Sequence, residues 1–152
     1  MSTSGIELSL SPGSQLPAVS VVLPVLNEEL HLANAIQSIL AQDYAGTLEI
    51  IVALGPSHDK TDEVAQKLAS KDARILLVQN PTGRTAAALN LAIHKSSNPV
   101  IVRVDAHAEL QSNYISLAIE VMVNKSSVTS VTETVKVYKL RLHFSTVITG
   151  YK

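Results

Sequence analysis

The segment NPVIVRVDAHAEL, residues 98–110, carries the side chains best suited to chemistry. It begins with an apolar run, residues 100–104, of the kind that forms a strand buried on both faces. Asp105 and His107 follow directly, two residues apart. A carboxylate and an imidazole at the carboxyl end of a buried strand reach the edge where open α/β sheets bind ligands. The pair is therefore a candidate site for a metal ion or a phosphate.

Asp105 and His107 can hold a divalent cation between them, because Mg²⁺ and Mn²⁺ need few protein ligands when phosphate oxygens and water complete the shell. The alternative is that Asp105 caps the following turn and His107 is a solvated loop residue. An isolated Asp-x-His favours that alternative. The convergence of other loops on the same edge favours the cation site.

Three further loops carry polar or small residues where a predicted strand ends. They are Asn27-Glu28, Gly55-Pro56-Ser57 and Gly83-Arg84. In a parallel sheet the carboxyl ends of all strands share one edge, so these loops and the Asp105 turn are expected to converge on one crevice.

Arg84 and the Asn27-Glu28 pair each have a functional and a structural interpretation. Arg84 follows a glycine at the start of a predicted helix, where backbone N–H groups and a guanidinium can bind the same anion; otherwise it is a surface arginine. Asn27 and Glu28 can hydrogen-bond a base or a ribose. An N-cap followed by acidic residues in the first helical turn is, however, the commoner meaning of such a pair.

The remaining histidines and two nearby aspartates are predicted to lie outside the site. The histidines are not spaced along the sequence like the ligands of a metal site. The positions of the aspartates indicate negative charges at the start of a helix. These residues are His31, His58, His94, His143, Asp59 and Asp62.

Hydrophobic periodicity predicts the elements that position these residues. Short apolar runs predict strands at residues 19–23, 48–54, 74–78 and 100–104, with Pro24 ending the first. Apolar residues at helical spacing predict helices from an Asn27 cap to about 42, at 61–70 and 84–95, and from a Ser112 cap to 122. This alternation predicts an α/β fold, a mostly parallel sheet flanked by helices on both faces through right-handed crossovers.

Composition divides the chain into three parts. Residues 1–17 are rich in Ser, Pro and Gly and predict a flexible lead-in, and residues 18–122 form the α/β domain. Residues 123–152 are a β-rich tail, dense in Val and Thr. Its alternation changes phase between Val137 and Tyr138, which predicts a bulge or a turn.

The length, composition and charge of the chain limit which kinds of partner it can bind. The 152 residues are 46% apolar, which suits one domain with a real core, and contain no cysteine for disulfides or thiolate metal sites. The 12 basic and 13 acidic residues are spread along the chain and give no electrostatic footprint for nucleic acid. No apolar run approaches the ~20 residues that span a bilayer, and residues 1–17 do not resemble a signal peptide. We therefore expect a cytoplasmic location, with any membrane association limited to a C-terminal part beyond this sequence.

Four motifs stand in a characteristic order: VSVVLPVLNEE, LEIIVAL with GPSHDKTDEV, NPTGRTAAALNLAI and VIVRVDAHAEL. They resemble the nucleotide-sugar half of family 2 glycosyltransferases, which have the GT-A fold. The DAHA segment is most similar to the succinoglycan-type exopolysaccharide glycosyltransferases. The resemblance covers about residues 19–122, and residues 123–152 do not resemble the family.

The resemblance implies a Rossmann-like GT-A domain that binds a nucleoside-diphosphate sugar together with a divalent cation, Mn²⁺ or Mg²⁺. It assigns nucleotide-sugar binding to Pro24, Asn27, Glu28, Gly55, Arg84, Asn90 and Asp105, with Arg84 near the diphosphate and Asn90 on the sugar side. Asp105 and His107 occupy the position of the family's DxD motif, which coordinates the cation that bridges the donor diphosphate.

Two positions depart from the family pattern. Many members carry a pair of aspartates at the end of the second strand, one of which binds the base. Ala53 and Leu54 stand there in this chain, so recognition of the base must differ. The DxD position ends in His107 instead of a second carboxylate, which reduces the negative charge offered to a hard cation.

The catalytic base is not identified by the sequence. Family members continue with an acceptor-binding half that supplies this base and binds a saccharide or lipid-linked acceptor, and neither Glu120 nor Glu133 resembles it. We therefore expect a donor-binding fragment of a glycosyltransferase. The alternative is a non-catalytic remnant or assembly module whose apolar tail pairs with another chain. A Rossmann dehydrogenase is disfavoured, because no Gly-x-Gly turn follows the first strand.

Overall fold

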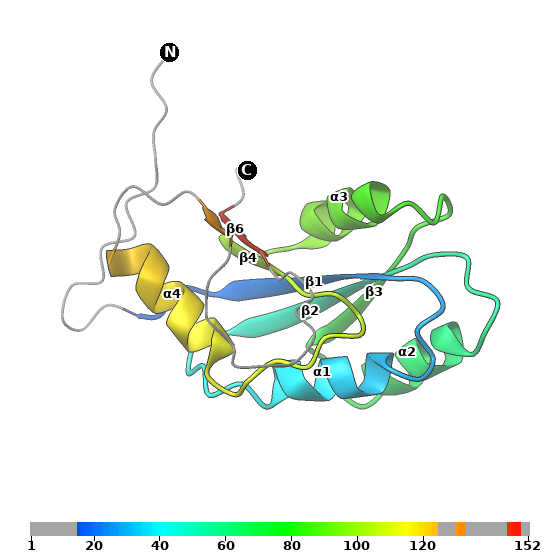
Figure 1. Ribbon diagram of the computed structural model, residues 1–152, viewed down its shortest axis with the longest axis horizontal. Helices are drawn as coiled ribbons and strands as arrows, with labels where there is room; N and C mark the ends of the chain where they lie inside the picture. Colours follow the sequence, from blue (N-terminus) through cyan, green and yellow to red (C-terminus); the bar gives the residue numbers. More distant parts are fainter. Residues whose placement is uncertain (1–14, 125–129, 133–145, 150–152) are drawn as a thin grey trace, which may run out of the picture.

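The computed structural model describes residues 15–124, 130–132 and 146–149, in which strands and helices alternate (Figure 1). The elements are β1 (Val19–Val25), α1 (Leu32–Leu40), β2 (Leu48–Leu54), α2 (Thr61–Ala69), β3 (Ile75–Gln79), α3 (Thr85–Lys95), β4 (Val100–Arg103), α4 (Tyr114–Asn124), β5 (Ser130–Thr132) and β6 (Thr146–Thr149). None of the helices in this part of the chain combines the length and the apolar character needed to cross a bilayer.

The strands form one sheet in the order β3-β2-β1-β4-β6-β5. Strands β1 to β4 are parallel, whereas β6 runs antiparallel to both β4 and β5. The predicted α/β fold with a mostly parallel sheet is therefore confirmed. From β1 the chain adds β2 and β3 on one side and then returns to place β4 on the other. This reversal creates a crevice at the carboxyl ends of β1 and β4.

Helices α1, α2 and α4 cover one face of the sheet, and α3 covers the other (Figure 1). Successive residues of β1 therefore enter different cores. Val21 and Leu23 belong to the larger core with Ile36 of α1, while Val22 packs with Ala88 of α3. Full burial of such side chains contributes roughly 1.5–3 kcal/mol each. Burial on both faces explains why β1 is apolar at consecutive positions.

Strand β1 continues past Pro24, although the sequence predicts that Pro24 ends it. The Val22 carbonyl faces β4, where it accepts a hydrogen bond from the Val104 N–H at 3.1 Å. Backbone groups of alternate residues face the same side, so Pro24 also faces the β4 side, but β4 ends at Arg103. No β4 residue is therefore paired with Pro24. Proline has no N–H, but at this position the sheet loses no hydrogen bond because of it.

Helix α1 begins at Leu32, five residues after the predicted cap at Asn27. Asn27 has a φ of 55°, a left-handed conformation that asparagine tolerates better than most residues. Its side-chain oxygen accepts a hydrogen bond from the His58 N–H at 2.8 Å, in the loop after β2. The prediction of Asn27 as N-cap is therefore wrong, and His31 holds that position without a side-chain cap bond.

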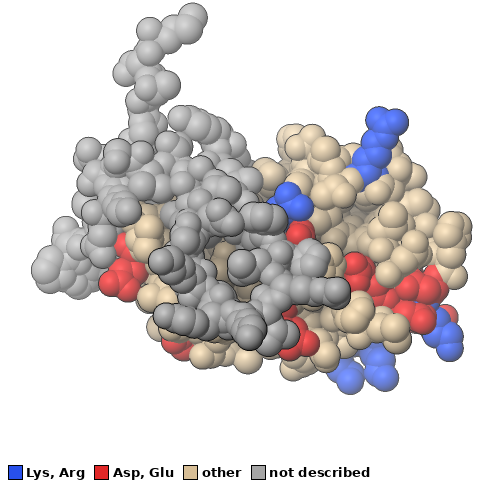
Figure 2. Space-filling model, viewed as in Figure 1, with Lys and Arg blue, Asp and Glu red and all other residues tan. Residues whose placement is uncertain are grey.

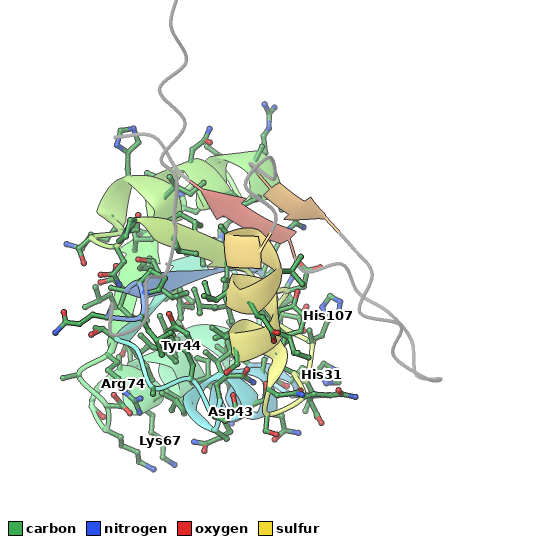
Figure 3. The ribbon with its side chains drawn as sticks, turned by 90° about the vertical axis from the view of Figure 1, so that its left-hand side faces the viewer. His31, Asp43, Tyr44, Lys67, Arg74 and His107 are labelled. Carbon is green, nitrogen blue, oxygen red and sulfur yellow. The ribbon has the colours of Figure 1, made fainter. Side chains whose placement is uncertain are left out.

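The loop after α1 fastens the start of α4 to the domain. The Asp43 N–H donates to the Ser112 carbonyl at 2.7 Å, and the Asp43 carboxylate accepts a hydrogen bond from the Ser116 hydroxyl. Asp43 lies beside α4 in Figure 3. These bonds hold the segment between β4 and α4 in place, and that segment contains the predicted Asp-x-His turn.

Strands β5 and β6 come from the predicted β-rich tail and extend the main sheet through the β4–β6 pairing. The predicted change of phase between Val137 and Tyr138 lies outside the described residues. The same holds for residues 1–14 of the predicted lead-in.

Candidate functional site

A pocket of about 260 Å³ opens at the carboxyl ends of β1 and β4. The loops after β1, β3 and β4 enclose it together with the first turn of α3. Its polar lining residues are Glu28, Asn80, Thr85, Arg103, Asp105 and His107. The structure thus brings four of the sequence-predicted site residues into one pocket, namely Pro24, Glu28, Asp105 and His107.

Asp105 follows β4 and is held by Arg103, the last residue of that strand. The Arg103 Nε and Nη2 atoms donate to Asp105 Oδ1 at 3.2 and 3.1 Å. The two side chains are 31% and 17% exposed, respectively, so water screens this ion pair less than a pair on the open surface. The pocket therefore contains a fixed positive charge next to its aspartate.

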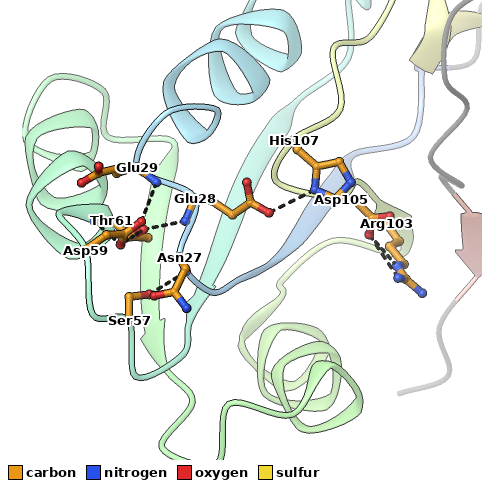
Figure 4. A network of polar contacts seen from close by, with 9 residues as sticks. All are labelled: Asn27, Glu28, Glu29, Ser57, Asp59, Thr61, Arg103, Asp105 and His107. Atoms are coloured by element: carbon orange, nitrogen blue, oxygen red, sulfur yellow. Dashed lines mark hydrogen bonds and ion pairs between the residues drawn. The ribbon is translucent and has the colours of Figure 1, made fainter.

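His107 is joined to Glu28 across the pocket (Figure 4). The Glu28 Oε1 atom lies 3.1 Å from His107 Nδ1, and the side chains are 19% and 33% exposed. Glu28 belongs to the loop after β1 and His107 to the turn after β4. The contact therefore links the two loops that border the crevice.

The start of α2 and the loop before it hold the backbone of Glu28 and Glu29. The Glu28 N–H donates to the hydroxyl of Thr61 at 2.7 Å, and that hydroxyl donates to Asp59 Oδ1 at 2.5 Å. Asp59 Oδ2 in turn accepts the Glu29 N–H at 3.2 Å. The hydrogen bond from Thr61 is the main cause that lowers the pKa of Asp59 below its usual value. Figure 2 shows the acidic side chains that gather where α2 lies.

Gly55 and Gly83 pack the loops after β2 and β3 against each other. A Cβ atom on Gly55 would lie 3.0 Å from Leu26 Cδ1, 3.2 Å from the Val25 carbonyl oxygen and 3.5 Å from Gly83 Cα. The Gly55 N–H also donates to the Val25 carbonyl at 2.8 Å. In this structure Gly55 therefore allows the loop after β2 to lie close to the end of β1 and to the loop after β3.

Four sequence-predicted site residues lie outside the pocket lining. Arg84 is exposed at the N-cap of α3, and Asn90 is exposed further along the same helix. Asn27 is held by the loop after β2, where its N–H donates to the Ser57 hydroxyl at 3.0 Å. Gly55 is buried. Their roles in nucleotide-sugar binding stay predictions.

The pocket suits a divalent cation only together with a phosphate ligand. Among the described residues, no group of three His, Cys, Asp or Glu side chains is placed to hold a metal. Both Arg103 bonds end on Asp105 Oδ1, which leaves Oδ2 without a hydrogen bond from the described part of the chain. Mg²⁺ is commonly bound by one or two carboxylates and by phosphate oxygens, and Asp105 with His107 fits that pattern.

The sequence did not predict the pocket-lining residues Asn80 and Thr85, nor three residues that hold other pocket side chains or loops in place, namely Arg103, Thr61 and Asp59. Arg103 had a readable signal, because a charged residue at the end of an otherwise apolar strand needs a partner. Thr61 and Asp59 had no such signal. Their contacts with Glu28 and Glu29 join segments about 30 residues apart and exist only in the folded chain.

Comparison with known proteins identifies the family. The sequence pattern of glycosyl transferase family 2 matches residues 20–146, most of the chain. The chain belongs to glycosyl transferase family 2. This match corrects the expectation that the resemblance ends near residue 122, since it includes most of the tail.

One of two similar relatives in glycosyl transferase family 2 is named for the succinoglycan subgroup that the DAHA segment predicts. The succinoglycan biosynthesis protein ExoA of Rhizobium meliloti is 30% identical over 102 residues, which are 66% of this chain and 31% of ExoA. An N-acetylglucosaminyltransferase of Bradyrhizobium elkanii is 31% identical over 122 residues, 72% of this chain and 62% of that protein. The chain thus spans about a third of ExoA and under two thirds of the second relative.

Solved structures show the same fold. One is the mannosyltransferase PcManGT from Pyrobaculum calidifontis in complex with GDP-Man and Mn²⁺, with a TM-score of 0.69 and 23% sequence identity. The superposition covers 84% of this chain and 38% of the PcManGT chain. Residues 1–349 of S. aureus TarS in complex with UDP have a TM-score of 0.63 and 21% identity, covering 70% of this chain and 32% of that one. The GT-A architecture predicted by resemblance is confirmed.

Proposed function

We propose that this chain is the donor-binding part of a glycosyltransferase that transfers a sugar from a nucleoside diphosphate to an acceptor hydroxyl. The observation that carries the proposal is the pocket at the carboxyl ends of β1 and β4, which is lined by Asp105, His107 and Arg103. Family membership and the ligands named for the structural neighbours support it.

The charges of the pocket suit a pyrophosphate. Transfer breaks the bond between the anomeric carbon and a diphosphate oxygen, so negative charge builds up on the departing nucleoside diphosphate. Arg103 lines the pocket and can donate hydrogen bonds to phosphate oxygens, which favours this charge. Asp105 Oδ2 and His107 would hold Mn²⁺ or Mg²⁺, which supplies Lewis-acid stabilisation of the leaving group when bound.

The donor is proposed to be a uridine or guanosine diphosphate sugar. Neighbours of the same fold were solved with UDP, UDP-GlcNAc and GDP-Man. The acceptor is proposed to be a growing saccharide or a lipid-linked saccharide, because ExoA is named for succinoglycan biosynthesis. No described residue is assigned as the general base that deprotonates the acceptor.

Isothermal titration calorimetry tests the proposal. The chain is titrated with UDP-sugars and GDP-sugars, with and without Mn²⁺, and we expect one nucleotide class to bind more tightly when Mn²⁺ is present. Asp105→Asn should remove this Mn²⁺ dependence, because an amide is a poorer ligand than a carboxylate for a hard cation. Glu120→Gln, an exposed change on α4, is the charge-matched control and should keep it. Absence of binding heat with every donor would refute the proposal.

A further inference from the structure

The backbone of Glu28 is held by Thr61, and its side chain contacts His107. The Thr61 hydroxyl, fully buried, accepts the Glu28 N–H and is itself fixed by its bond to Asp59 Oδ1. The Glu28 carboxylate then lies 3.1 Å from His107 Nδ1. Segments after β1, β2 and β4 are thus connected by a continuous series of hydrogen bonds (Figure 4).

We propose that Glu28 is a positioning residue that fixes His107 in the Nδ1–H tautomer and so sets the orientation of the imidazole ring at the DxD position. This inference rests on the proposed function for its consequence, but the tautomer itself can be measured without any ligand. A carboxylate accepts hydrogen bonds and has no proton to give at neutral pH, so a neutral His107 must place its proton on Nδ1 to bond with Glu28. The lone pair is then on Nε2.

The consequence concerns the DxD position, where His107 replaces a second carboxylate. A neutral imidazole offers a cation no negative charge, and this weakness is offset when a carboxylate hydrogen-bonded to the other ring nitrogen raises the basicity of the ligand. Glu28 lies where it can do so. The Glu28 carboxylate would therefore act on the cation through His107, as a replacement for the missing second acidic ligand.

The neighbouring carboxylates do not offer the same contact. Glu29 Oε2 accepts the Lys60 N–H at 2.8 Å, on the side of α2. Glu109 Oε1 accepts a hydrogen bond from the Asn34 side chain at 3.4 Å, and Glu109 is exposed. Glu109→Gln is therefore a matched control: it removes the same charge two residues from His107 without removing the contact between Glu28 and His107.

The experiment has two readouts. The first is the tautomer of His107, read from the nitrogen chemical shifts of its ring in the ligand-free chain at a pH where imidazole is neutral. We expect the Nδ1–H form in the unchanged chain and in Glu109→Gln, its loss in Glu28→Ala, and its retention in Glu28→Gln, because the glutamine oxygen can still accept the bond. An Nε2–H form in the unchanged chain, or an unchanged tautomer in Glu28→Ala, overturns the inference.

The second readout is the affinity for Mn²⁺ in the presence of UDP or GDP. Loss of an outer partner of a metal-bound histidine typically weakens affinity about 10- to 100-fold, and we expect that loss in Glu28→Ala, a smaller one in Glu28→Gln and none in Glu109→Gln. Equal losses in Glu28→Ala and Glu109→Gln overturn the inference. If the unchanged chain binds neither nucleotide nor Mn²⁺, the proposed function fails, while the tautomer measurement still decides the role of Glu28.

Discussion

Arg103 lines the pocket beside Asp105, whereas Arg84, at the N-cap of α3, is exposed and lies outside the pocket lining. The sequence resemblance assigns the diphosphate to Arg84. The structure offers Arg103 as a second cation, one that is already oriented because Asp105 fixes its guanidinium at 3.1 Å. A guanidinium held in position loses less conformational entropy when it binds a phosphate.

Replacement of each arginine by alanine distinguishes the two. We expect Arg103→Ala to weaken binding of the nucleoside diphosphate roughly 10- to 100-fold, since a charge-assisted hydrogen bond contributes about 1.5–3 kcal/mol. Arg84→Ala should weaken it less. Calorimetry with the diphosphate and with the corresponding nucleoside makes the comparison, because the nucleoside should be insensitive to both changes. A larger loss in Arg84→Ala would assign the diphosphate to Arg84.

The fold was predictable because its signals are local. Strand β2 agrees with the predicted residues 48–54, and α2 and α3 differ from their predictions by one residue at one end. Burial on both faces makes such strands apolar throughout, and this pattern is visible in any short window of the sequence. The convergence of strand ends on one edge then follows from parallel pairing.

The details of the site were less predictable because they depend on contacts between distant segments. Asn27 resembles a helix cap in the sequence, but its left-handed backbone and its bond to His58 become visible only when the loops after β1 and β2 meet. The contact between Glu28 and His107 joins residues 79 positions apart. Local patterns identified these residue types without identifying their partners.

Thr61→Val tests how much the hydroxyl under Glu28 contributes to stability. Valine has nearly the same shape, but it cannot accept the Glu28 N–H or donate to Asp59, and Thr61 is fully buried. We expect the free energy of unfolding to fall by about 1–3 kcal/mol in urea denaturation. Thr47→Val, at an exposed position, should change it by less than about 0.5 kcal/mol. Equal effects would mean that the hydroxyl does not hold the loop.

Glu49→Gln should make stability less dependent on pH. Burial acts to raise the pKa of Glu49, but hydrogen bonds from Ser20, Ser97 and Asn98 outweigh it and lower that pKa. The Ser20 hydroxyl and the Ser97 N–H lie 2.5 and 2.7 Å from Glu49 Oε1. A carboxylate with a lowered folded pKa stabilises the protein above its unfolded pKa, and this contribution disappears as the pH falls through the folded value.

We therefore expect Glu49→Gln to lose about 1–2 kcal/mol of unfolding free energy at neutral pH, and the difference from the unchanged chain to shrink in acid. Urea denaturation at a series of pH values measures this difference in unfolding free energy, and the exposed Glu120→Gln variant is the control. A difference that stays constant through the acid range would contradict the link to the ionisation of Glu49.

Gly83→Ala tests the backbone at the edge of the pocket. Gly83 has a φ of 67°, which costs a residue with a Cβ roughly 1–2 kcal/mol, and the added Cβ would also lie 3.2 Å from Pro56 Cδ. Both effects strain the turn that leads into α3 and lines the pocket, so we expect lower stability in urea and weaker nucleotide binding. Gly83→Asn has the same contact with Pro56, but asparagine tolerates the left-handed conformation better. The asparagine variant should therefore be the more stable of the two; equal losses would show that the contact with Pro56, and not the backbone conformation, is what requires glycine.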